Sequence, residues 1–139
     1  MSAYQTQSTV FEDKYSLIKG LSENGYGLNT VEVHDTPQTL YDYCGHPRPQ
    51  KAHIILRRQF VGGAANDIGF LKNTDGTYTA IISEYDSMRH NAAWITNLTK
   101  SYAKHALIKQ GKRMGLTFLG VSAQKGTGKP VVQFRKALA

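Results

Sequence analysis

Residues 66–86, NDIGFLKNTDGTYTAIISEYD, constrain the fold of this chain more than any other stretch. Apolar residues recur at alternate positions on both sides of Asp75-Gly76. An Asp-Gly pair between such runs is a strong signal for a β-hairpin, because both turn residues must tolerate positive φ. A hairpin cannot bury one face alone. We therefore predict two strands joined at Asp75-Gly76 and covered by helices from elsewhere in the chain.

Two segments of the chain predict these helices. Residues 13–24 carry leucine and isoleucine at helical spacing between Asp13, which suits an N-cap, and Gly25, which suits the left-handed residue after a helix. Residues 91–114 carry a second apolar stripe with lysines off it, and Gly115 can end that helix.

The remaining segments complete the fold prediction. Residues 1–8 are polar and expected to be flexible, and residues 34–51 contain three prolines with little periodicity, which predicts a long loop. Alternating patterns predict strands at residues 9–11, 28–33, 52–60, 116–123 and 130–138. This order predicts a single α+β domain over residues 1–139, with a mainly antiparallel sheet, two helices on one face and a ferredoxin-like variant as the closest template.

Length and composition narrow the class of protein. The 139 residues suffice for one core but not two. The sequence contains no run of about 18 apolar residues, so we expect no membrane span, and its start lacks the pattern of a secretion signal. The single cysteine, Cys44, excludes an internal disulfide and favours a reducing, cytoplasmic location.

Charge is the most informative bulk property. The net charge is +7, with seven basic and ten acidic residues in 1–86 but ten basic and no acidic residues in 87–139. Such a split indicates a region attractive to an anion, although a solvated basic face that only maintains solubility stays open as an alternative.

The basic residues of the second predicted helix and the final pair of strands form the candidate anion-binding set. If the two elements adjoin, they make a positive strip suited to phosphates. No motif for reading bases is present, so we expect salt-sensitive, weakly sequence-selective binding. The members are Lys100, Lys104, Lys109, Lys112, Arg113, Lys125, Lys129, Arg135 and Lys136.

The leading hypothesis is therefore a small non-enzymatic binding protein. Its partner would be nucleic acid, as the first candidate, or an acidic protein surface. In the second case the chain would be an adaptor or inhibitor that docks on a host complex.

Motifs for catalysis and metal binding are weak. Gly126-Thr127-Gly128-Lys129 resembles a phosphate loop, but Pro130 and a strand follow it, so we predict a hairpin turn. Cys44 and His46 are two residues apart, and no C-x-x-C or H-x-x-x-H spacing is present. We expect no catalytic residue, metal or cofactor.

A pocket around Cys44 is the third hypothesis, and it would make the chain an enzyme or small-molecule binder. It requires two groups of residues that are far apart in the sequence to converge. The residues of this possible pocket are Tyr43, His46, Arg48, Tyr102 and His105.

Several segments resemble one known family. They are DKYSLIKGLSENGY, AHIIL, DIGFLKNTDGTYTAI and LTKSYAKHALIKQGKRMGL. These segments resemble the uncharacterised family of conserved chloroplast open reading frames, which also occurs in cyanobacteria and phages. The resemblance implies a small soluble α+β protein without an established activity, in a plastid stroma or a host cytoplasm. The chain departs from the family in its final hairpin, which lacks acidic residues, and in a longer segment at residues 37–49. Both departures suggest a specialised, phage-encoded member.

Overall fold

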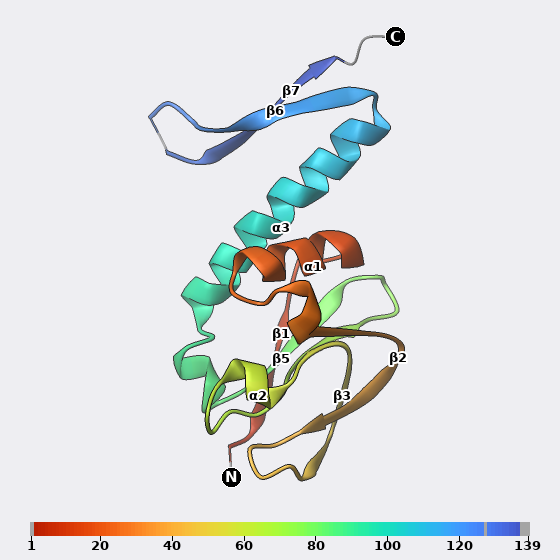
Figure 1. The fold of residues 1–139 in the computed structure, drawn as a ribbon, viewed down its shortest axis with the longest axis vertical. Coiled ribbons are helices and arrows are strands. Elements are labelled where there is room, and N and C mark those ends of the chain that lie inside the picture. Colours follow the sequence, from red (N-terminus) through yellow and green to blue (C-terminus); the bar gives the residue numbers. More distant parts are fainter. Residues whose placement is uncertain (1, 127, 137–139) are drawn as a thin grey trace.

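The structure is a computed structural model that describes residues 2–126 and 128–136. It confirms the α+β class, with a five-stranded sheet, a two-stranded sheet and helices (Figure 1). Among the described residues, no helix is long and apolar enough to cross a membrane. The elements in chain order are β1 (Tyr4–Ser8), α1 (Lys14–Glu23), η1 (Leu28–Thr30), β2 (Val31–Tyr41), β3 (Pro47–Leu56), α2 (Arg58–Val61), β4 (Ile68–Lys72), β5 (Tyr78–Ser83), η2 (Asp86–Met88), α3 (Ala92–Arg113), β6 (Leu116–Ala123) and β7 (Pro130–Lys136).

The main sheet has the strand order β1-β5-β4-β3-β2, and every neighbouring pair is antiparallel. Strands β2 to β5 form a meander, and β1 returns to pair with β5. In the ferredoxin-like order β-α-β-β-α-β, two strands separate the helices. Here β2 to β5 stand between α1 and α3, and the strand after α3 belongs to the second sheet.

Helices α1 and α3 cover one face of the main sheet, as predicted. Leu17 and Leu21 of α1 and Leu98 of α3 are fully buried in one cluster with sheet residues such as Ile54 and Phe70. The helices approach closely at Gly20, where a Cβ atom would lie 3.2 Å from the backbone nitrogen of Tyr102. Glycine is therefore used here for helix contact, at some cost in helix propensity.

Local capping sets the ends of both long helices where the sequence predicts them. The Asp13 carboxylate accepts the Ser16 N–H at 3.0 Å, and Gly25 follows α1 with φ of 97°. The Asn91 side chain accepts the Trp94 N–H at 3.1 Å. Gly115 follows α3 with φ of 77°. Each terminus thus satisfies a free backbone group through a side chain or a left-handed residue.

The hairpin at residues 66–86 is confirmed as β4 and β5, with one correction at its turn. Lys72 pairs with Tyr78, so five residues connect the strands instead of two. Gly76 has φ of 92°, whereas no described non-glycine residue has positive φ. Asp75 instead accepts hydrogen bonds from the Thr77 N–H and hydroxyl, at 2.9 and 2.6 Å.

The long loop predicted at residues 34–51 is wrong, because this segment forms the β2–β3 hairpin. Proline misled the prediction, since it usually interrupts a sheet. Pro37 lies at a register shift between β2 and β3. Pro47 and Pro49 lie in a part of β3 that has no β4 partner, since β4 pairs only with Ile54–Leu56. Pro47 and Pro49 have no N–H group to donate, but at these positions no hydrogen bond to β4 is lost.

Three further boundaries differ from the prediction. Residues 28–30, predicted as the start of a strand, form η1, and β2 begins at Val31. The first strand is Tyr4–Ser8, paired with β5, in a segment expected to be flexible, and residues 9–11 are not a strand. Most of its side chains are exposed, so the polar sequence carried no signal of burial. Strand β3 ends at Leu56, and the short helix α2 occupies Arg58–Val61.

The second sheet consists of β6 and β7 and lies at the far end of α3, away from the main sheet (Figure 1). It meets α3 at Gly111, where a Cβ atom would lie 2.3 Å from the Phe134 ring. The strands predicted at residues 116–123 and 130–138 are confirmed as β6 and β7, except that residues 137–138 lie outside the described part of the chain.

Candidate functional site

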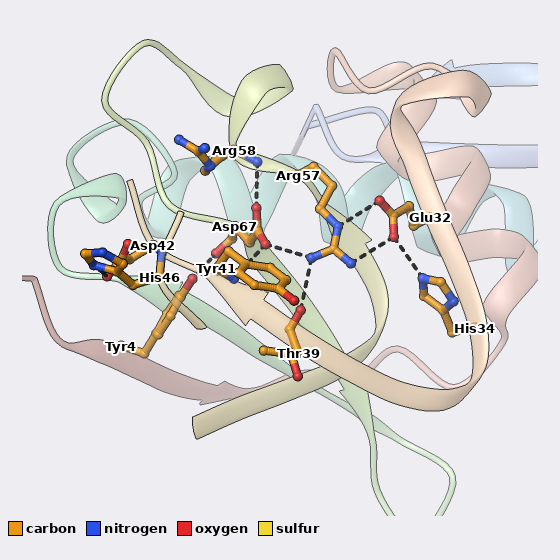
Figure 2. Close-up of polar contacts among 10 residues, drawn as sticks. All are labelled: Tyr4, Glu32, His34, Thr39, Tyr41, Asp42, His46, Arg57, Arg58 and Asp67. Atoms are coloured by element: carbon orange, nitrogen blue, oxygen red, sulfur yellow. Dashed lines mark hydrogen bonds and ion pairs between the residues drawn. The ribbon is translucent and has the colours of Figure 1, made fainter. Parts of the chain in front are cut away.

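Arg57 lies at the centre of a polar network between the strands (Figure 2). Its guanidinium donates to both Glu32 oxygens at 2.7 and 3.0 Å, to Asp67 Oδ2 at 2.8 Å and to the Thr39 carbonyl at 3.0 Å. The hydrogen bonds from Arg57 lower the pKa of Glu32, which also lies 2.9 Å from His34 Nε2. Since the guanidinium is engaged on both sides, we assign Arg57 a structural role.

Asp67 is the buried partner in this network, with 1% of its side chain exposed. Its carboxylate also accepts the N–H groups of Tyr41 and Arg58, both at 2.7 Å. Its carbonyl accepts the Tyr4 hydroxyl at 2.6 Å, and burial is the main cause that raises the pKa of Tyr4. Both carboxylate oxygens of Asp67 are therefore used to join strands.

Asp42 organises the turn between β2 and β3. Its Oδ1 accepts the N–H groups of His46 and Cys44, at 2.9 and 3.0 Å. These two backbone groups lower the pKa of Asp42. The Asp42 N–H donates to the His46 carbonyl at 2.9 Å, and the Gly45 N–H donates to the Asp42 carbonyl at 2.8 Å. The backbone of this turn is thus closed from both ends.

The second oxygen of Asp42 has different surroundings. The side chain is 0% exposed, yet Oδ2 has no hydrogen-bond partner and lies 3.9 Å from His46 Nδ1. One ligand atom from each of Asp42, Cys44 and His46 lies within 4.8 Å of the others. Cys44 is exposed, and 70% of the His46 side chain is exposed. A carboxylate, a thiol and an imidazole therefore gather at one turn.

A second buried network joins this turn to the segment after β5. Asp86 Oδ2 accepts the Ser83 hydroxyl at 2.7 Å and the Asn66 N–H at 2.9 Å. Asn66 Oδ1 in turn accepts the Tyr43 N–H at 2.9 Å. These hydrogen bonds from Tyr43 to Asn66 and from Asn66 to Asp86 therefore hold the β2–β3 turn against the body of the protein.

A cavity of about 420 Å³ lies beside Asp86 and is lined also by Gly62, Gly63, Arg89 and His90. His90 Nε2 lies 2.6 Å from the Tyr26 hydroxyl, while its buried Nδ1 has no hydrogen-bond partner in the described structure. Burial lowers the pKa of His90 and raises the pKa of Tyr26 to about 12. The pair is therefore neutral near pH 7.

Tyr102 and His105 face α1 and the segment before it. The Tyr102 hydroxyl accepts the N–H groups of Glu12 and Asp13, at 2.9 and 3.0 Å. His105 Nε2 lies 3.0 Å from the Glu23 carboxylate. Both residues thus have structural partners between the helices.

The other predicted pocket residues lie elsewhere. Arg48 donates to the Ser2 carbonyl at 3.2 Å, and Tyr43 and His46 belong to the β2–β3 turn near the start of β1 (Figure 1). The structure therefore does not bring Tyr43, His46 and Arg48 together with Tyr102 and His105. The enzyme hypothesis, which needs that convergence, gains no support.

Two lysines of the predicted anion-binding set have acidic partners within the chain. Lys104 Nζ lies 2.5 Å from Glu23, and Lys109 Nζ lies 2.6 Å from Asp13. These contacts tie α3 to α1 and neutralise part of the predicted strip.

The other members of the set lie mainly toward the far end of α3 and on the second sheet. Lys129 belongs to the turn between β6 and β7. The rest have no ion-pair partner among the described residues: Lys100, Lys112, Arg113, Lys125, Arg135 and Lys136.

The sequence prediction considered Cys44 and His46 but not Asp42 as a donor beside them, and it missed the cavity at Asp86. The donors occur as D-x-C-x-H in a tight turn, a spacing that differs from the C-x-x-C and H-x-x-x-H patterns typical of zinc sites. A search for acidic, thiol and imidazole groups at alternate positions would have found the cluster. No local sequence signal connects Gly62-Gly63 with Arg89 and His90, which line the same cavity.

The sequence model of a family described as a protein of unknown function (DUF1257) matches residues 26–129. No curated protein and no solved structure gives a significant match.

Proposed function

This chain belongs to the DUF1257 family of proteins of unknown function, and from that premise we propose that it is a small non-enzymatic binding protein for an anionic partner. Nucleic acid is the first candidate. The observation that carries this proposal is that residues 87–139 contain ten basic and no acidic residues. These residues include the second sheet, which lies apart from the main sheet at the end of α3 (Figure 1).

Ion pairs within the chain reduce the number of basic residues that are available to an external anion. Lys104 and Lys109 have partners on and beside α1, so they contribute less to an external anion. We define the tail surface as the end of α3 together with the β6–β7 hairpin. Its basic residues are Lys112, Arg113, Lys125, Lys129, Arg135 and Lys136.

Counterion release is the physical basis of the proposed binding. Each phosphate neutralised by lysine or arginine releases condensed cations from the nucleic acid, so affinity falls steeply as salt rises. The tail surface carries no motif for base recognition, and its contacts would therefore be to phosphates. Binding should depend strongly on salt and weakly on sequence.

A salt series tests this proposal. Labelled duplex DNA and single-stranded RNA are titrated with the untagged protein, and retention on a filter is measured from low to physiological ionic strength. For duplex DNA, log K should fall with log salt by about 0.9 for each phosphate neutralised. An absence of retention at the lowest salt, for both DNA and RNA, would exclude a nucleic-acid partner.

An acidic protein surface is the second candidate, and exposed apolar residues favour it. Met114 is 69% exposed, Leu119 57% and Val121 45%, and all three lie on or beside the tail surface. Apolar contacts surrounded by charge are typical of protein interfaces. In a pull-down from lysate, treatment with nuclease should leave an acidic protein partner bound and should release partners held through nucleic acid.

The resemblance also supports proposals about source and location. We propose a plastid, cyanobacterial or phage origin and action in a reducing, cytoplasmic compartment. The exposed, unpaired Cys44 agrees with a reducing compartment. Recovery of the protein from its native source as a Cys44-linked disulfide dimer would contradict that location.

A further inference from the structure

We propose that the β2–β3 turn is a binding site for a divalent transition-metal ion, with zinc as the preferred ion. The ligands would be Asp42 Oδ2, Cys44 Sγ and His46 Nδ1. Figure 2 shows Asp42 and His46 side by side at this turn. The proposal is independent of the tail surface.

The positions of the donor atoms suit one metal ion. One ligand atom from each of Asp42, Cys44 and His46 lies within 4.8 Å of the others, and Asp42 Oδ2 is 3.9 Å from His46 Nδ1. Bonds of about 2.0–2.3 Å in a tetrahedral zinc site place ligand atoms roughly 3.3–3.7 Å apart. Cys44 and His46 are exposed, so rotation of their side chains can close this small difference without moving the backbone.

The buried carboxylate of Asp42 is a second, independent indication of a ligand. Its Oδ1 is held by two backbone N–H groups, but its Oδ2 has no hydrogen-bond partner although the side chain is 0% exposed. Leaving a buried charged oxygen without a partner is costly. A cation between Oδ2 and the neighbouring imidazole and thiol would supply the missing interaction.

The turn holds the carboxylate before any ion arrives. Gly45 has φ of 80°, a conformation that favours glycine, and its N–H closes the turn on the Asp42 carbonyl at 2.8 Å. The two N–H groups on Oδ1 fix the direction of Oδ2, as outer hydrogen bonds commonly do for metal-binding carboxylates. Folding of the turn therefore already orders the Asp42 carboxylate before a metal ion binds.

The donor chemistry selects the class of ion. Calcium and magnesium prefer all-oxygen sites, whereas a thiolate with an imidazole favours zinc and related transition metals. Three protein ligands leave a fourth position for water or an external ligand. Arg58 lies nearby, since a Cβ atom on Gly45 would be 3.3 Å from its guanidinium. We therefore expect weaker affinity than in a closed four-ligand zinc site.

Cobalt is the probe that tests the site most directly. Cys44 is the single cysteine of the chain, so a thiolate-to-cobalt charge-transfer band can arise only at this turn. Titration of the untagged, reduced protein with Co²⁺ should give this band with one ion bound per chain, and Zn²⁺ should displace it. Absence of the band at saturating Co²⁺ would overturn the proposal.

Substitutions assign the ligands. Cys44→Ser should abolish the band, and Asp42→Asn and His46→Gln should each weaken Zn²⁺ binding by calorimetry at least about tenfold. Asparagine keeps the Oδ1 acceptor of the turn, so Asp42→Asn should fold, which circular dichroism checks. His34→Gln, elsewhere in the same hairpin, is the matched control and should bind Zn²⁺ like the wild type. Equal affinities in Cys44→Ser and the wild type would contradict the site.

Discussion

Two buried aspartates, Asp67 and Asp42, have different hydrogen-bond partners. Both oxygens of Asp67 accept hydrogen bonds, from Arg57 and from two backbone N–H groups. Asp42 uses one oxygen in the same way and leaves the other without a partner. This difference assigns Asp67 to the scaffold and makes Asp42 a candidate ligand.

The substitution Asp67→Asn should destabilise the fold. An amide in place of the carboxylate turns one acceptor into a donor. If the amide nitrogen replaces Oδ2, it faces the N–H groups of Arg57 and Tyr41, and if it replaces Oδ1, it faces the N–H group of Arg58. We expect a loss of about 3 kcal/mol in the free energy of unfolding, measured with urea. The matched control is Asp75→Asn in the exposed β4–β5 turn, where the change should stay within about 0.5 kcal/mol. Similar losses in both variants would contradict the structural role of Asp67.

Gly69→Ala tests how closely β4 packs against residues of the β2–β3 hairpin. An added Cβ atom would lie 2.5 Å from the Ala52 Cβ and 3.1 Å from Leu40 Cδ1. Overpacking of this kind costs about 1–3 kcal/mol. Gly63→Ala is the control, because among the described residues no atom beyond its chain neighbours lies within 4 Å of its added Cβ. A melting temperature that does not fall in Gly69→Ala would show that the hairpin does not close on β4 as described.

At the scale of elements, local signals explain which parts of the fold could be predicted. The helix ends were predicted because Asp13, Gly25 and Gly115 lie at the helix termini themselves. The β2–β3 hairpin was missed because whether Pro47 costs a hydrogen bond depends on β4, which is distant in sequence. For the same reason the sequence does not show which of the basic residues have acidic partners within the chain. The pairing of Lys104 with Glu23 depends on how α1 packs on α3.

The contact between α1 and α3 should be sensitive to acid through Glu23. Desolvation alone would raise the pKa of Glu23, but the hydrogen bond from Lys104 and the nearby His105 ring outweigh it and lower this pKa in the folded state. A depressed folded pKa contributes stability above the ordinary value of 4.5, and this contribution is lost as the pH falls below it.

Glu23→Gln should therefore reduce stability at pH 7 and have little effect at pH 3. An exposed ion pair is worth only about 0.2–1 kcal/mol, so urea titrations at both pH values are compared directly. Glu84→Gln, an exposed residue with no ion pair in the described structure, is the control. An equal effect of Glu23→Gln at both pH values would contradict this linkage.

Gly111→Ala should disturb the second sheet selectively. The added Cβ atom would overlap the Phe134 ring at 2.3 Å, so β7 must move away from α3. An isolated two-stranded sheet is at best marginally stable. Amide hydrogen exchange should therefore speed up in β6 and β7 but not in β4 and β5. Unchanged exchange in β6 and β7 would show that the contact with α3 does not support the hairpin.

The whole molecule divides its charge between two regions. The main sheet and α1 lie within residues 1–86, which have an excess of acidic residues, whereas residues 87–139 have none. Internal pairs use two lysines of α3 to hold the helices together. The tail surface holds six of the ten basic residues of 87–139, which is the central reason for expecting an anionic partner there.

Binding of duplex DNA by a tail variant tests this claim most directly. Fluorescence anisotropy at low salt compares the wild type with Arg135→Ala/Lys136→Ala and with the control Lys51→Ala/Lys72→Ala, which removes two exposed lysines of the main sheet. Loss of two phosphate contacts should weaken binding by the tail variant and reduce its salt slope by about 2, while the control keeps the wild-type slope. Equal affinities and slopes for both variants would contradict binding through the tail surface.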